Sequence, residues 1–398
     1  MATYFANATL FDGRSVKTRA GVLVDGGRIG WVGSHARAPR AARSADEVAA
    51  DRAMLAPGLI DCHVHLCFDG GPDFVAEARV TEPFAAVKCV GNAARHLAAG
   101  VTTVRDLGGL GSVACDVGRA IDEGRVPGPK VIASGQALTI TGGHGWNSFA
   151  RQVDGPDSVR QAVREQIRGG ARSIKIVATG GVLTPGIPVD FTAFTFDEVS
   201  AAVDEAHTWG VPIAAHAIGR TGIDHCVRAG IDSIEHGCQI SVETAREMKG
   251  RGACHVPTIS ALRQIIDHPE TVPSYAVEKA ISVERMARDA FRRSIREGVP
   301  IACGTDAGTP HNAHGGAPGE IVRMVRWGLT PLKALRAATS TAASLLRVSS
   351  EVGTVEPGKA ADLVLFDGDP LDDVTNILSP RLVLRAGEIV ARAGALAS

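Results

Sequence analysis

The sequence of 398 residues has no excess of either charge, no long apolar run and few aromatic residues. Its 42 basic and 43 acidic residues are interspersed, and the net charge is −1, so nothing indicates a nucleic-acid or membrane-surface partner. A transmembrane helix needs about 18 consecutive apolar residues, and the chain contains no such run. The first residues, MATYFANATLFDGRS, lack the basic and apolar regions of a signal peptide. We therefore expect neither a membrane segment nor a secretory leader.

Disulfide and metal-binding CxxC patterns are also absent. The eight cysteines are scattered, and five of them (Cys62, Cys226, Cys238, Cys254 and Cys303) lie in or beside apolar segments, as small buried thiols do. This usage fits the reducing cytoplasm, where we expect the protein to be located.

Both ends of the chain have the pattern of short β-strands separated by turns. The N-terminal part contains TYFANATLFDG, GVLVDGGRIGWVG and AMLAP, and the C-terminal part contains ADLVLFDGDP and LVLRAGEIVARAG. Neither end is long enough to bury a core alone. We therefore predict that residues 1–57 and 351–398 pair into one small β-sandwich domain, with residues 58–350 inserted between its halves.

Residues 58–350 alternate between short apolar strands and amphipathic helices. Eight strands are predicted, at Leu59–His63, Thr102–Arg105, Lys130–Ala133, Ser173–Val177, Pro212–Ala215, Ser233–Glu235, Ala253–Val256 and Pro300–Gly304. Eight strand–helix units favour an α/β fold of the (β/α)8 TIM-barrel type. A doubly wound open sheet is the alternative, and it is disfavoured because no GxGxxG follows a strand.

The segment GLIDCHVHL (58–66) places two histidines at the end of the first predicted strand. Side chains at positions i and i+2 of a strand point to the same side, so His63 and His65 leave the strand together, spaced to hold a metal ion. Such a pair indicates a metal site only when further ligands accompany it.

Four further polar residues stand in or at the ends of later predicted strands, namely Lys175, His216, His236 and Asp306. The chemistry of a barrel takes place at this rim. Four histidines exceed the three protein ligands of a single catalytic zinc, so two divalent ions, most simply zinc, are expected. An ammonium has no lone pair, so Lys175 can be a ligand only after modification; otherwise it is a cation for the substrate.

This arrangement resembles the amidohydrolase superfamily in its binuclear form. The segments that carry the resemblance are RDLGG (105–109), TGGHG (141–145), IKIVATGG (174–181), SIEHG (233–237), GTDAG (304–308) and the tail EVGTVEPGKAADLVLFDGDPL. They are similar to the branch that contains prolidase-like Xaa-Pro and Xaa-Arg dipeptidases, imidazolonepropionase-related proteins, and hydrolases of ochratoxin, carbamates and phenylureas.

The resemblance implies a small-molecule hydrolase that cleaves an amide-type C–N bond of a dipeptide, an N-acyl amino acid, or a carbamate or aryl amide. It implies a CO2-derived carbamate on Lys175 between two ions, one held by His63, His65 and Asp306 and the other by His216 and His236. Asp306 would act as base and then as acid. We also expect a homo-oligomer.

Six further residues are candidates for the substrate site. His144 lies in a glycine-rich loop and is expected to act on the transition state, while Gly181 and Val182 are expected in a pocket wall. The related dipeptidases often have HAY or HAH where this chain has HAI, so Ile218 offers no side-chain donor, and Arg220 is a candidate replacement. His311 is a candidate pocket residue. Residues 261–279 depart from tight helical patterning and are a candidate lid.

Three other functions compete with this one. A lactone or phosphotriester hydrolase could use the same ions. A non-catalytic scaffold barrel predicts missing ligands, whereas all six positions are filled here. A mononuclear deaminase usually lacks the lysine and has a glutamate after the fifth strand, where this chain has HAIG.

Overall fold

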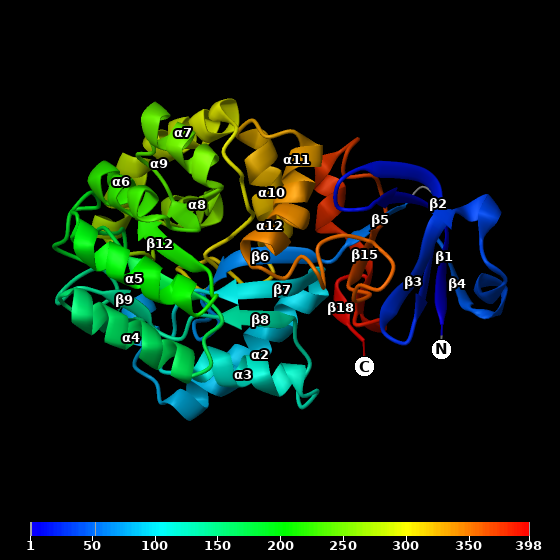
Figure 1. The fold of residues 1–398 in the computed structure, drawn as a ribbon, viewed down its shortest axis with the longest axis horizontal. Coiled ribbons are helices and arrows are strands. Elements are labelled where there is room, and N and C mark those ends of the chain that lie inside the picture. Colours follow the sequence, from blue (N-terminus) through cyan, green and yellow to red (C-terminus); the bar gives the residue numbers. More distant parts are fainter. Residues whose placement is uncertain (1, 52, 398) are drawn as a thin grey trace.

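The computed structural model describes residues 2–51 and 53–397. Parallel strands and the helices around them form one large body, and a separate sheet containing both chain termini lies at one side of it (Figure 1). The predicted α/β barrel, with β-structure built by both chain ends, is confirmed.

The two chain ends share one nine-stranded sheet. Antiparallel pairing of β15 (Leu363–Phe366) with β5 (Met54–Pro57) joins them, with Leu365 opposite Leu55. Both chain ends therefore belong to one continuous sheet, whose two halves share an apolar cluster that includes Phe5, Val22 and Leu384. The other strands of this sheet are β1 (Thr3–Phe11), β2 (Val16–Asp25), β3 (Arg28–Ser34), β4 (Asp46–Ala49), β16 (Pro380–Arg385), β17 (Glu388–Arg392) and β18 (Ala395–Leu396).

Seven of the eight predicted barrel strands form regular strands, within two residues of the predicted ends. They are β6 (Leu59–Val64), β7 (Val101–Asp106), β8 (Lys130–Ala133), β11 (Ile174–Val177), β12 (Ile213–Ala217), β13 (Ser233–His236) and β14 (Cys254–Val256). The ladders between them are parallel. Two short strands, β9 (Ala137–Thr139) and β10 (Ala150–Gln152), extend the sheet beside β11. The carboxyl ends of the strands therefore lie at one rim.

The eighth predicted strand, Pro300–Gly304, closes the barrel without forming a regular ladder. It lies between β14 and β6, because His255 makes a parallel bridge with Ile301 and the Cys62 N–H donates to the Cys303 carbonyl over 2.8 Å. The Cys303 N–H instead donates to the carbonyl of Ala337, at the end of a neighbouring helix. This contact replaces a rung of the ladder and explains why the strand is irregular.

Helices surround the barrel strands (Figure 1). They are α1 (Phe74–Glu77), α2 (Glu82–Ala98), α3 (Val113–Asp122), α4 (Pro156–Arg168), α5 (Phe196–Thr208), α6 (Arg220–Ala229), α7 (Val242–Arg251), α8 (Ile259–Asp267), α9 (Ser274–Glu297), α10 (Ala317–Arg326), α11 (Pro331–Ala337) and α12 (Ser340–Leu345), with 3-10 turns at His35–Arg37, Arg40–Ser44 and Val374–Leu378. The prediction that residues 261–279 depart from regular helix is wrong, because α8 and the start of α9 occupy most of this segment. None of the helices in the described residues is long and apolar enough to span a membrane.

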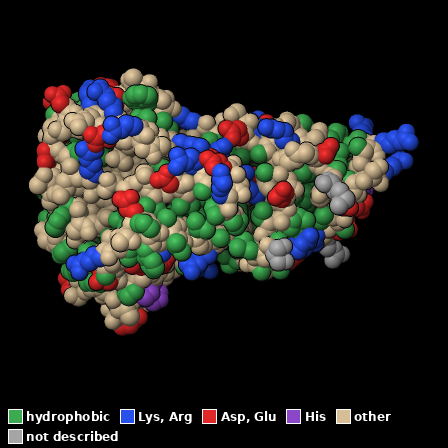
Figure 2. Space-filling model, turned by 90° about the horizontal axis from the view of Figure 1, so that it is seen from below, with side chains coloured by type: hydrophobic (Ala, Val, Ile, Leu, Met, Phe, Trp, Pro, Cys, Tyr) green, Lys and Arg blue, Asp and Glu red, His purple; other side chains and the backbone are tan. Residues whose placement is uncertain are grey.

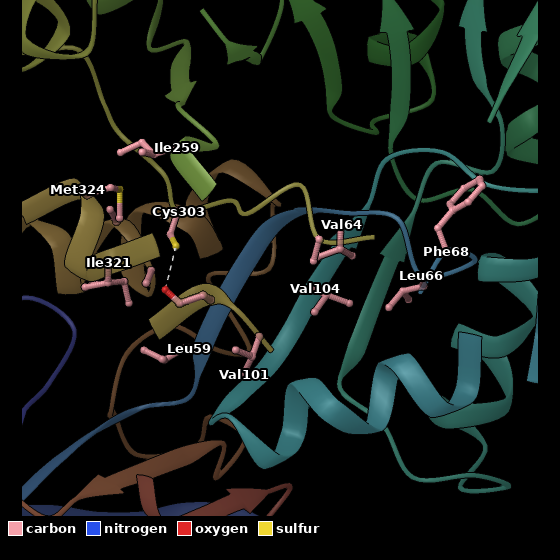
Figure 3. Packing of buried hydrophobic residues seen from close by; sticks show 14 of the residues in the cluster. Leu59, Val64, Leu66, Phe68, Val101, Val104, Ile259, Cys303, Ile321 and Met324 are labelled. Carbon is pink, nitrogen blue, oxygen red and sulfur yellow. Dashed lines mark hydrogen bonds between the residues drawn. The ribbon is translucent and has the colours of Figure 1, made fainter. Parts of the chain in front are cut away.

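Apolar side chains fill the space between the first strands and the helices behind them. Figure 3 shows Leu59 of β6 and Val101 of β7 near Ile321 of α10, all fully buried. On the molecular face shown in Figure 2, basic and acidic side chains are interspersed around apolar ones. Because the strands are sealed from water, a polar group among them must find its partners inside the protein.

Candidate metal centre

Seven histidine, lysine and aspartate residues from different barrel strands and loops line one cavity at the carboxyl rim. His63 and His216 lie in β6 and β12, His236 ends β13, and Lys175 lies within β11. His65 follows β6, and the other two come from later loops. The full set is His63, His65, His144, Lys175, His216, His236 and Asp306. The structure thus brings together every residue predicted as a metal ligand.

Two of the histidines are oriented by backbone carbonyls. His65 Nδ1 lies 2.7 Å from the Gly108 carbonyl oxygen, and His216 Nε2 lies 2.9 Å from that of Gly180. A carbonyl can only accept, so each of these ring nitrogens carries the proton. The opposite nitrogen of each ring, His65 Nε2 and His216 Nδ1, is the one available to bind a metal.

Side chains orient the other two. His63 Nδ1 lies 2.8 Å from Glu235 Oε2, and His236 Nδ1 lies 2.7 Å from Thr258 Oγ1. A carboxylate behind an imidazole fixes its tautomer and makes its free nitrogen more basic. His236 and Thr258 both have left-handed backbones, with φ of 67° and 47°. Strained non-glycine residues of this kind concentrate at functional sites.

The carboxylate of Asp306 lies among these rings. Its Oδ1 is 3.3 Å from His63 Nε2 and 3.1 Å from His65 Nε2. Potential ligand atoms of His63, His236 and Asp306 all lie within 4.8 Å of one another, close enough to share one ion. Asp306 also has a left-handed backbone, with φ of 62°.

Lys175 is 2% exposed and has an imidazole, not a carboxylate, as its nearest polar partner, with Nζ 3.3 Å from His63 Nε2. Burial lowers the pKa of its ammonium to about 8, an effect that the negative charges of Glu235 and Asp306 partly offset. A fraction of the side chain is therefore a neutral amine near pH 7.

The protonation states of the site suit metal binding. Burial lowers the pKa of His63, His144 and His236 well below the ordinary value, and that of His216 to about 4, so these rings are neutral near pH 7. Burial alone would raise the pKa of Asp306, but the surrounding His63, His65 and Lys175 hold it well below its usual range. Neutral imidazoles and an ionised carboxylate are the forms that bind metals, so this donor set fits divalent cations.

A fully buried ion pair between Arg105 and Glu235 lies behind His63, and it was not predicted from the sequence. Arg105 Nη2 donates to Glu235 Oε1 over 2.8 Å, and both side chains are 0% exposed. The same guanidinium donates to the Cys62 carbonyl and to Ser233 Oγ, over 2.6 and 3.1 Å. Both charged residues lie in predicted buried strands. A charged side chain in such a strand is the signal that identified Lys175, so these two residues could have been recognised in the same way.

Asp61 is a second residue that sequence reasoning missed. Its Oδ1 accepts from the N–H groups of His63 and Thr305, and its Oδ2 accepts from Thr305 Oγ1 over 2.7 Å. This carboxyl group ties β6 to the segment that carries Asp306. It therefore fixes the spacing between the first and last ligands.

His144 is held by the loop that follows β11. Its Nδ1 lies 2.7 Å from Thr184 Oγ1, which also accepts from the Gly145 N–H over 3.1 Å. The His144 ring centroid is 4.7 Å from that of His216. A Cβ on Gly181 would lie 2.4 Å from the His144 ring, so only glycine allows this approach.

The remaining wall of the cavity is apolar apart from Thr309. Val182 and Ile218, both predicted in the substrate site, belong to it, and the full apolar set is Phe74, Phe149, Val182, Leu183, Ile218, Cys238, Ala261, Leu262 and Ile265. Segment 261–279 therefore contributes a wall through α8.

Gly181 lies against the His144 ring without lining the cavity, and two other predicted substrate residues lie away from it. Arg220 begins α6 with its side chain 60% exposed, 3.7 Å from Asp224 and 3.6 Å from Glu243. His311 stacks on His268, with ring centroids 4.2 Å apart, and lines a different hollow. Neither residue lines the cavity of the ligand candidates in this structure, and their role in substrate binding stays a prediction.

Comparisons with known proteins agree with this geometry. The model of the amidohydrolase family matches residues 54–390. Ochratoxinase of Aspergillus niger is 30% identical over 404 residues, covering 94% of this chain and 82% of that protein. Imidazolonepropionase of Streptomyces griseus is 28% identical over 379 residues, covering 87% of this chain and 85% of that protein.

A solved structure of a Xaa-Pro dipeptidase with methionine bound in its active site is 33% identical. It superimposes with a TM-score of 0.90 and covers 98% of this chain and 99% of that one. The similarity thus extends over the barrel and the sheet of the chain ends. The chain belongs to the amidohydrolase family, and it is a hydrolase that acts on carbon–nitrogen bonds.

Proposed function

We propose that this protein hydrolyses an amide-type C–N bond of a small molecule (a dipeptide, an N-acyl amino acid, or a carbamate or aryl amide) with two divalent metal ions, most simply zinc. One observation carries the proposal. Four imidazoles line one buried cavity, and each has one nitrogen hydrogen-bonded to a group outside the predicted ligand set, which leaves the other nitrogen available for a metal. A structural histidine cluster has no need of this arrangement, whereas a metal site requires it.

The residues divide into two ligand groups. His63, His65 and Asp306 would hold one ion, and His216 and His236 the other, with Lys175 between them. When bound, such ions supply hydroxide at neutral pH, because they lower the pKa of a water from about 15.7 to about 7, and they polarise the carbonyl that is attacked.

Asp306 is the proton carrier in this proposal. Its low pKa keeps it ionised, and its left-handed backbone aims it into the cavity beside the free nitrogens of His63 and His65. It accepts the proton of the attacking water and then delivers it to the departing nitrogen. An amide anion is too basic to leave unprotonated, so this second transfer is needed for the bond to break.

His144 stabilises the oxygen of the attacked carbonyl. Thr184 Oγ1 accepts from Gly145, and its own hydroxyl proton is then available for His144 Nδ1. A ring that accepts at Nδ1 carries its proton on Nε2. The neutral ring therefore donates Nε2–H toward developing negative charge, as an oxyanion-hole donor does.

Lys175 is proposed to carry a CO2-derived carbamate. Only a free amine adds CO2, and burial lowers the pKa of Lys175 to about 8, so this form is present near neutral pH. The test is carbon-13 NMR of protein equilibrated with labelled bicarbonate and zinc, in which a carbamate resonance is expected. Lys175→Ala, with exposed Lys249→Ala as the control, should lose that resonance and bind less metal. An unchanged spectrum would refute the modification.

The experiment that tests the function combines metal analysis with a substrate panel. Protein purified without chelator should contain about two equivalents of metal and hydrolyse members of an amide and carbamate panel. Removal of the metal should abolish turnover, and added zinc should restore it. Hydrolysis confined to lactones or phosphotriesters would instead support the alternative use of the same ions.

The domain boundaries are part of the proposal. β5 ends at Pro57 and β6 begins at Leu59, which supports a boundary at 57/58, and 350/351 falls between α12 and β15. The homo-oligomeric state and the cytoplasmic location stay predictions. Light scattering of the purified protein measures the first of these.

A further inference from the structure

The cavity has a polar end and an apolar wall, and the wall is built by several elements. The α8 residues Ala261, Leu262 and Ile265 form one part of it, and Phe74, Phe149 and Ile218 contribute others. All six are 8% exposed or less. A substrate whose carbonyl lies at the polar end therefore places its substituents against hydrocarbon.

The basic side chains that could recognise a substrate carboxylate are committed elsewhere. Among the residues that the structure describes, Lys175 is the only lysine or arginine lining the cavity, and it stands among the metal-ligand candidates. Lys279 lies next to the wall, but its Nζ donates to the carbonyls of Gly181, Thr184 and Ile187 over 3.2, 2.7 and 2.7 Å. An ammonium has three donors, so none remains for a ligand.

Two neutral donors at the cavity are also committed. The Ile218 N–H donates to Thr179 Oγ1 over 3.0 Å, and Thr309 Oγ1 donates to the Asp306 carbonyl over 2.7 Å. Burial of an ionised carboxylate without a partner costs several kcal/mol at least. No side chain of the wall is positioned to offset this cost with a hydrogen bond or an opposite charge.

We infer that the preferred substrate is an amide or carbamate with uncharged, apolar groups on both sides of the scissile bond, and that a free carboxylate beside that bond is selected against. This inference rests on the proposed function and narrows it. It favours carbamates and aryl amides over dipeptides and N-acyl amino acids.

The test uses compounds that differ only in charge. Benzanilide is compared with its para-carboxylate and its para-carboxamide, and N-benzoyl-phenylalanine is compared with its primary amide. A carboxamide has nearly the shape of a carboxylate without the charge. In each pair we expect kcat/KM of the carboxylate to be lower than that of the carboxamide by about tenfold or more.

The outcomes separate the two proposals. Equal or better hydrolysis of the carboxylates would overturn the inference and leave the proposed function intact. Failure of the metal-loaded protein to hydrolyse any of these amides, or any dipeptide or carbamate of the wider panel, would overturn the proposed function itself.

A pair of variants at Ile218 tests whether the apolar wall causes the selectivity against carboxylates. Ile218→Arg adds a cation, whereas Ile218→Met keeps the side chain apolar and of similar size. The carboxylate-to-carboxamide ratio of kcat/KM should rise about tenfold in the first variant relative to the second. An unchanged ratio in folded Ile218→Arg would contradict the role of this wall. Should that variant not fold, the wild-type ratios still decide the inference.

Discussion

Glu235 Oε2 lies 2.8 Å from His63 Nδ1, and both side chains are buried in the barrel. The other carboxylate oxygen accepts from Arg105, so one glutamate links a metal-ligand candidate to a buried guanidinium. The carboxylate thus fixes the tautomer of His63 and balances a charge that has no access to water.

Glu235→Gln should weaken metal binding and destabilise the fold together. Removal of a partner behind a ligating histidine typically costs about 10–100-fold in metal affinity. Loss of one member of a buried ion pair costs about 3–5 kcal/mol, because Arg105 would be left without its counter-charge. Competition with a chelator measures the affinity, and urea unfolding measures the stability. Glu388→Gln, an exposed change in β17, is the control.

Asp306→Asn should separate metal binding from turnover. The asparagine keeps an oxygen near His63 and His65, so much of the metal should remain bound. It cannot accept and return a proton, and kcat should fall by about 10²–10⁴-fold. Metal analysis and steady-state kinetics on one preparation distinguish these effects. Full activity in this variant would refute the role of Asp306 as proton carrier.

The ligand positions could be predicted from the sequence because each stands in or just beyond a short apolar run. Parallel strands share one carboxyl edge, so His63, His216, His236 and Asp306 had to meet once the barrel was recognised. Lys175 could be identified because burial of an ammonium inside a strand is costly unless the charge is compensated, which indicates a functional role.

Tertiary pairings could not be predicted in the same way. Arg105 and Glu235 are 130 residues apart, and their pairing depends on how the barrel closes. The irregular eighth strand results from the Ala337 carbonyl, which no local pattern in PIACG reveals. The sequence also does not show that the side chain of Arg220, at the start of α6, is 60% exposed and lies away from the cavity.

The buried carboxyl group of Glu320 should give a pH-dependent contribution to stability. It accepts from the N–H groups of Ile259 and Ser260 at the start of α8, over 2.7 and 2.8 Å. Burial raises its pKa from 4.5 to about 7 despite these bonds. Between these values the folded protein holds a proton that the unfolded chain has lost, so this contribution declines as the pH rises from about 4.5 to about 7.

Glu320→Gln removes that titration. The difference in unfolding free energy between the wild type and the variant should therefore shrink, or change sign, as the pH rises through this range. Urea unfolding of the metal-loaded proteins at several pH values measures it, with exposed Glu47→Gln as the control. Parallel stability curves for the wild type and Glu320→Gln would contradict the raised pKa.

Lys279 should control the shape of the cavity without contacting the substrate. Its three donated hydrogen bonds hold the loop that provides Val182 and Leu183 to the wall and Thr184 to His144. Tyr275, one turn earlier in α9, donates to the Leu183 carbonyl over 3.0 Å.

Lys279→Met removes the ammonium but keeps an unbranched side chain, so the loop carbonyls lose their donors. We expect KM to rise and kcat to fall, with kcat/KM lower by about tenfold, or 1.4 kcal/mol. Metal content should stay unchanged, because the ligands lie on other elements. Lys249→Met, on the exposed side of α7, is the control and should leave KM, kcat and metal content as in the wild type. If Lys279→Met also left KM and kcat unchanged, the loop would be held by its own packing and the role of Lys279 would be refuted.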